Sequence, residues 1–96
     1  MMQRKKIDAN QKSIVTTLRS IGALVHSTAS IGNGFPDIVV GFRGKVYLFE
    51  IKDGTKPVSA QALTEHERKF HQLWNGYVHI VDSADSVLRI LFQEIR

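Results

Sequence analysis

The 96-residue chain lacks cysteine altogether, has only two prolines, and contains no long hydrophobic run. Without cysteine, it has neither a disulfide framework nor zinc sites built on thiolates. No stretch approaches the roughly 18–20 apolar residues that a membrane span needs, and no apolar signal-peptide segment follows the basic start. These absences predict no membrane association and fit the reducing cytoplasm.

The excess of basic over acidic residues is also small. Lysine and arginine number 13 against 9 acidic residues, so the formal net charge is +4. This excess mildly favours a polyanionic partner, although many unrelated small proteins reach it. Hydrophobic residues make up 43%, which is enough for one modest core rather than a disordered tail. The length predicts a single domain over residues 1–96, with residues 1–7 as a flexible basic arm.

Hydrophobic periodicity predicts an α/β fold with the element order αβββαβα. An apolar stripe that starts at Ile14 predicts a first helix, which ends at Gly22. The segment 53–61 is expected to be a loop. The remaining elements are expected as strands at residues 23–30, 37–42, 45–52 and 77–81, and as helices from Thr64 to Asn75 and after Ser83. This order indicates a mixed β-sheet flanked by helices, in which the strand at 45–52 is central because it is nearly all apolar.

The second helix carries a start signal and an apolar stripe. Thr64 is followed three residues later by Glu67, which predicts a capping box. Phe70, Leu73 and Trp74 follow at helical spacing and are interpreted as core residues rather than as a surface for DNA. The four histidines lack the i, i+4 pairing of a helical zinc site and are interpreted as surface or packing residues.

Two of the apolar strands carry carboxylates, which are costly inside a protein unless they are compensated. The tight Arg43-Gly44 connection pairs residues symmetrically about the turn, so Asp37 is expected to face Glu50. Glu50 and Lys52 stand at i and i+2, which places them on one face of the strand. Two neighbouring carboxylates share a proton or hold a cation such as Mg²⁺. The alternative is a solvent-exposed charge cluster without a function.

The segments Pro36-Asp37 and Glu50-Ile51-Lys52 together give the pattern PD…ExK, by which the sequence resembles the PD-(D/E)xK nuclease superfamily. More narrowly, it resembles the small phage and bacterial VRR-NUC (virus-type replication-repair nuclease) proteins. The resembling segments are "DANQKSIVTTLRSIGA", "GNGFPDIVVGFRGKVYLFEIKDG", and "LTEHERKFHQLWNG" followed by "VHIVDS". They cover about residues 8–83. The resemblance implies a restriction-endonuclease-like core.

The resemblance also implies an activity, namely metal-dependent hydrolysis of phosphodiester bonds in DNA. Asp37, Glu50 and the carbonyl of Ile51 would hold Mg²⁺ or Mn²⁺, and Lys52 would act in catalysis. Relatives work on branched DNA and include dimeric Holliday-junction resolvases, so a homodimer is expected. A phage-encoded chain would act in the cytoplasm of its bacterial host.

One position departs from the pattern of related nucleases. Gln11 stands where they often carry a glutamate, ahead of the apolar stripe of the first helix. A glutamine accepts hydrogen bonds but lacks the negative charge. Gln11 is therefore interpreted as a further catalytic-site residue, with a surface residue in the first helical turn as the alternative. The rival functions are a catalytically weak or inactive DNA-binding module and a regulatory or assembly protein with an incidental match.

Basic side chains are expected to flank the carboxylates and to contact DNA. Each would neutralise a phosphate and make binding depend on salt, while ordinary solvation is the alternative for any one of them. The predicted DNA contacts are Arg4, Lys5, Lys6, Lys12 and Lys56, and the same basic flank is extended by Arg19, Arg68 and Lys69.

Overall fold

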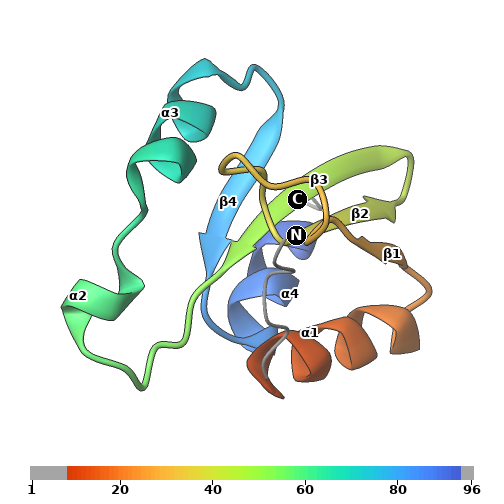
Figure 1. The fold of residues 1–96 in the computed structure, drawn as a ribbon. Helices are drawn as coiled ribbons and strands as arrows, with labels where there is room; N and C mark the ends of the chain where they lie inside the picture. Colours follow the sequence, from red (N-terminus) through yellow and green to blue (C-terminus); the bar gives the residue numbers. More distant parts are fainter. Residues whose placement is uncertain (1–8, 94–96) are drawn as a thin grey trace.

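The computed structural model describes residues 9–93, which form a mixed α/β fold with a four-stranded sheet flanked by helices (Figure 1). The α/β class and the flanked mixed sheet predicted from the sequence are confirmed. The elements are α1 (Ala9–Ser20), β1 (Leu24–Ser27), β2 (Ile38–Phe42), β3 (Lys45–Ile51), α2 (Val58–Gln61), α3 (Glu65–Leu73), β4 (Tyr77–Val81) and α4 (Ala84–Phe92). Among these helices, none has the length and apolar character needed to cross a membrane.

The sheet has the strand order β1-β2-β3-β4, with β3 inside as expected. The first three strands pair antiparallel, and β4 pairs parallel to β3. Arg43 and Gly44 both have positive φ angles, 51° and 82°, which is the backbone of a tight type I′ hairpin. Ile38 consequently lies opposite Phe49. The symmetric register predicted about this turn is confirmed from Ile38 to Phe42, and Asp37 directly precedes these paired residues.

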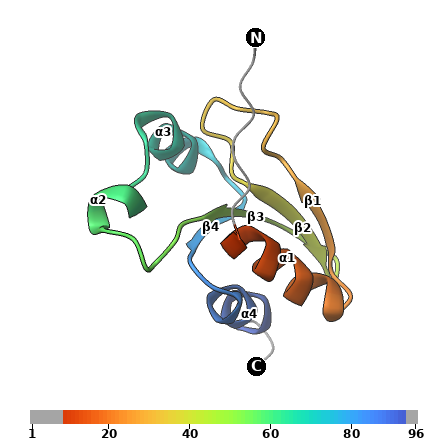
Figure 2. The same cartoon turned by 60° about the horizontal axis from the view of Figure 1, so that its bottom comes forward.

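The hydrophobic core lies on the face of the sheet that α1 and α4 cover (Figure 2). Strand alternation sends every second side chain of β2 and β3 into this layer. Phe49, at the centre of β3, is 0% exposed, whereas Val46 points to the other face and is 62% exposed. The core residues are Ile14, Leu18, Ala23, Val25, Ile38, Val40, Tyr47, Phe49, Ile51, Val81, Val87 and Leu91.

Helices α2 and α3 lie beyond the edge strand β4, away from α1 (Figures 1 and 2). The loop expected at 53–61 is wrong in part, because α2 adds a short helix at its end. Four residues are too few to show an apolar period. The assignment of Leu73 to the core is also wrong, since its side chain is 80% exposed and Trp74 is 41% exposed. At the sheet edge, only one side of α3 faces the protein.

Candidate active site

Asp37 lies directly before β2 and is held there by hydrogen bonds. Its carboxylate oxygen Oδ2 accepts from the backbone N–H of Ile51 at 2.7 Å. Its own N–H donates to the carbonyl of Phe49 at 2.9 Å, and its carbonyl accepts from the N–H of Thr28 at 2.9 Å. The two bonds to β3 involve the residues on either side of Glu50. The Asp37 carboxylate therefore lies beside the backbone of the Glu50-Ile51-Lys52 segment.

Both carboxylates are buried. Asp37 is 3% exposed and Glu50 is 0% exposed. Glu50 lies in the inner strand β3, with Ile80 of β4 at the paired position. The alternative of a solvent-exposed charge cluster is therefore wrong. Burying a carboxylate costs free energy unless charges, donors or a cation compensate it, so two such groups at one sheet end mark a site of chemical interest.

Lys52 is anchored to the start of α3. Its Nζ lies 3.0 Å from Oε1 of Glu67, and both side chains are largely buried. The same Oε1 accepts from the backbone N–H of Thr64 at 2.8 Å, and the Thr64 hydroxyl accepts from the N–H of Glu67. The predicted capping box is confirmed. Glu67 also lies next to Lys52, so one carboxylate takes part in both the helix cap and the ion pair.

The loop that leads to Asp37 packs against the same first turn of α3. Gly34 has a φ of +81°, and a Cβ placed on it would lie 2.3 Å from the backbone carbonyl of His66. Only glycine allows so close an approach at this φ. Phe35 then meets Phe70 edge-to-face, with ring centroids 5.1 Å apart. These contacts fix the loop carrying Asp37 to the helix carrying Glu67, an arrangement that the sequence signalled only through its glycines.

The start of α1 is joined to the same end of the sheet. The Asn10 side-chain amide donates to the carbonyls of Lys52 at 2.9 Å and Asp82 at 3.0 Å. Gln11 is the next residue, and it is only 7% exposed. The alternative of Gln11 as a surface residue is therefore wrong. Asn10, which the sequence did not single out for the site, connects α1 to the residues that follow β3 and β4.

The predicted DNA contacts are only partly within the described chain. Lys12 is exposed on α1, and Lys56 is exposed in the segment after β3. Arg4, Lys5 and Lys6 lie outside residues 9–93. Their predicted roles, and that of the 1–7 arm, remain predictions.

His71 lies one helical turn after Glu67 and is coupled to the site by charge. Burial lowers the pKa of His71 below its ordinary value, Glu67 acts in the opposite direction, and Lys52 lowers it again. Its buried Nε2 has no hydrogen-bond partner among residues 9–93. Burial also lowers the pKa of His79, and the charge of His71 adds to this effect.

These shifts predict that the protein loses stability on acidification. Below a pH of about 6.5 the unfolded chain binds protons that the folded protein resists, so the free energy of unfolding falls until the pH passes the lower folded-state pKa. His71→Gln is expected to flatten this dependence, measured as urea midpoints between about pH 7.5 and pH 5. His26→Gln, at an exposed position of β1, serves as control. A His71→Gln profile parallel to that of the native chain would contradict the assignment.

Potential metal ligands are few within the described part of the chain. No group of three or more His, Asp or Glu side chains among residues 9–93 is arranged to hold a metal ion. Asp37 and Glu50 supply two carboxylates, whereas Gln11, the residue after Asn10 on α1, carries an uncharged amide. Magnesium often takes only one or two carboxylates and completes its shell with water and phosphate oxygens. An all-oxygen set of two carboxylates and the Ile51 carbonyl fits such an ion.

The chain matches no protein-family model, no curated protein sequence and no solved structure. Conclusions about its activity therefore depend on the chemistry of the residues at the end of the sheet.

Proposed function

We propose that the chain is a divalent-metal-dependent endodeoxyribonuclease of the VRR-NUC type, with a restriction-endonuclease-like core. The hydrogen bond from the Ile51 N–H to the Asp37 carboxylate carries this proposal. It joins the PD segment to the ExK segment at one end of the sheet, which is the juxtaposition that the sequence pattern requires. The hairpin register alone would bring the two segments together, so the burial of both carboxylates is the second support, because an incidental match would leave them in solvent.

The donor set suits Mg²⁺ or Mn²⁺, with Asp37, Glu50 and the Ile51 carbonyl as the proposed ligands. A divalent ion held there would supply Lewis-acid activation for hydrolysis of a phosphodiester bond. The burial of both carboxylates favours this role, because a cation compensates the cost of burying their charge.

Lys52 would stabilise the negative charge that develops on the phosphate oxygens during hydrolysis. Its ammonium group is already ordered by Glu67, which is in turn held by the cap of α3. Pre-ordering matters because a group that must be immobilised during the reaction costs entropy. Glu67 is thus proposed to position Lys52, while Gln11 lines the α1 side of the site as a hydrogen-bonding group.

The proposed substrate is branched DNA such as a Holliday junction, cut by a homodimer. Both parts follow from the resemblance, and a two-fold symmetric dimer would match the symmetry of a junction. The test is cleavage of an end-labelled four-way junction beside a linear duplex of the same arm sequence, with Mg²⁺ or Mn²⁺. Cutting that needs the metal, is lost in Asp37→Ala and is faster on the junction is expected. No cutting in either metal would refute the proposal.

A DNA-binding module without effective catalysis is the second candidate, and the buried Gln11 is the observation that favours it. We expect Gln11→Glu to change the cleavage rate by less than about tenfold, because one or two carboxylates suffice for many magnesium sites. Rates on the junction would be compared with those of Gln72→Glu, which adds the same charge at an exposed position of α3. A gain of about 100-fold or more from Gln11→Glu alone would favour the binding module.

A further inference from the structure

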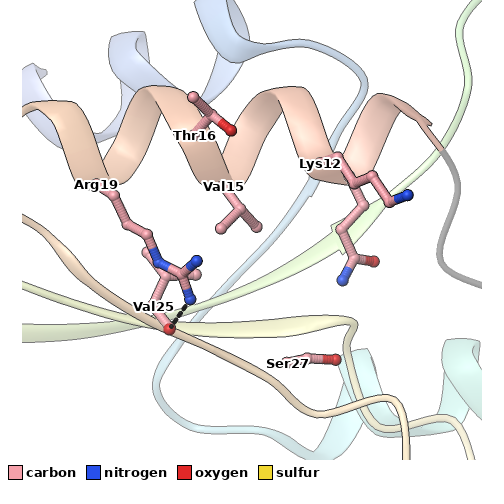
Figure 3. Close-up of a pocket in the computed structure, with 7 residues that line it drawn as sticks. Lys12, Val15, Thr16, Arg19, Val25 and Ser27 are labelled. Atoms are coloured by element: carbon pink, nitrogen blue, oxygen red, sulfur yellow. Dashed lines mark hydrogen bonds between the residues drawn. The ribbon is translucent and has the colours of Figure 1, made fainter.

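A pocket of about 420 Å³ lies between α1 and β1, on the side of the sheet covered by α1 (Figure 3). Its wall combines a small apolar part with hydroxyl, amide and cationic groups. None of the described lining residues is acidic. The side chains used below are Lys12, Val15, Thr16 and Arg19 of α1 and Val25 and Ser27 of β1.

One end of this pocket adjoins the candidate active site. Gln11 lines it, and the preceding residue Asn10 is hydrogen-bonded to the carbonyl of Lys52. On the other wall, Ser27 is paired with Ile38, the residue that follows Asp37. A ligand in the pocket would therefore lie beside residues that neighbour Lys52 and Asp37.

The pocket extends along α1 away from that end. Gln11 and Arg19 are separated by about 12 Å of helix at a rise of 1.5 Å per residue. Successive phosphates of one DNA strand advance by about 3.4 Å along the duplex axis. The far end of the pocket thus lies roughly three nucleotides from the near end, within the reach of a strand that is cut at Asp37 and Glu50.

Arg19 at the far end is held in a defined orientation. Its Nη2 donates to the carbonyl of Val25 at 3.1 Å, and Figure 3 shows the side chain extending from α1 to β1. A guanidinium has five N–H donors in a planar fork that suits phosphate oxygens. One donor fixes the side chain to β1, and the others can serve an anion. Lys12 adds a second cation nearer the start of the helix.

We propose that this pocket binds a backbone phosphate of the cleaved DNA strand, roughly three nucleotides from the bond that is cut, with Arg19 as its main contact and Lys12 in support. The absence of acidic lining residues, together with two cations and two hydroxyls, fits a phosphate better than a neutral or cationic ligand. The partly buried Val15 faces the sugar. This assignment rests on the proposed function, because it takes DNA as the substrate.

The test is binding of a fluorescein-labelled four-way junction, followed by anisotropy over a range of salt concentrations with Ca²⁺ in place of Mg²⁺. Arg19→Ala is expected to weaken binding about tenfold and to lower the slope of log K against log salt by about one. Arg19→Lys keeps the charge and is expected to recover the salt slope. Arg89→Ala, an exposed arginine of α4, is the matched control and is expected to stay within about twofold.

A second variant separates the pocket from the charge. Thr16→Trp, at an exposed position of α1, would fill the pocket without removing a cation, and it is expected to weaken binding about tenfold. Circular dichroism would confirm that each variant is folded. If Thr16→Trp is unfolded, the comparison of Arg19→Ala with Arg19→Lys alone tests whether the pocket binds the phosphate.

The outcomes distinguish this inference from the proposed function. A chain that binds the junction through Arg19 but never cuts it supports the pocket and refutes the nuclease. If the native chain cuts DNA, and the Arg19→Ala variant binds DNA as tightly as the native chain with the same salt slope, only the assignment of the pocket is refuted. A chain that binds no DNA overturns both.

Discussion

Replacing Asp37 by asparagine is expected to lower metal-dependent DNA cleavage by at least about 100-fold while the chain stays folded. Asparagine keeps an oxygen that can accept the hydrogen bond from the Ile51 N–H, now 2.7 Å from the Asp37 carboxylate. It removes the negative charge that the proposed metal site needs. The variant therefore separates the structural role of Asp37 from its chemical role, which Asp37→Ala does not.

The measurement is the single-turnover rate on an end-labelled junction with the protein in excess. Asp85→Asn is the matched control, because it removes the same charge from an exposed position at the start of α4. Its rate is expected to stay within about twofold of the native rate. A rate for Asp37→Asn within about tenfold of the native one, in a folded variant, would show that Asp37 is not a metal ligand.

The largest expected effect on stability comes from Phe49. Its side chain is fully buried at the centre of β3, between the rings of Tyr47 and His79. Phe49→Ala would leave a cavity there and is expected to lower the free energy of unfolding by about 3–5 kcal/mol. Domains of this size have a total stability of about 5–15 kcal/mol, so the variant would be close to unfolding.

Urea denaturation followed by circular dichroism measures this effect. Val46→Ala, three residues earlier in the same strand, is the control, because Val46 points to the exposed face of the sheet. Its change is expected to stay within about 0.5 kcal/mol. Equal urea midpoints for the two variants would contradict the assignment of the two faces of β3.

The pairing of the second and third strands could be predicted because the apolar runs and the turn between them indicated the same register. The apolar runs around the Arg43-Gly44 turn fixed a symmetric pairing, and the structure has that pairing at Ile38 and Phe49. The register follows from turn length alone, with no need for distant contacts. The proximity of Asp37 to the ExK segment could therefore be anticipated from the chain itself.

The surroundings of the site were less predictable, since they depend on where α3 lies. Its apolar stripe suggested a core helix, yet the helix lies past the edge of the sheet and leaves Leu73 exposed. The capping box was enough to account for Glu67 in the sequence. Nothing in the neighbouring residues predicted that Glu67 also contacts Lys52. The glycine at position 34 suggested a backbone with positive φ. It did not indicate that the backbone of His66 packs against this position and leaves no room for a side chain.

In the proposed function, Asp37 and Glu50 together hold a divalent ion at the end of the sheet. The most direct measurement is a titration of the ¹⁵N-labelled protein with substoichiometric Mn²⁺, which broadens the amide signals of residues close to the ion. If Asp37 and Glu50 bind the ion, the signals of Ile51 and its neighbours are lost selectively, and this loss is abolished in Asp37→Asn. Broadening elsewhere in the chain, or the same pattern in Asp37→Asn, would contradict it.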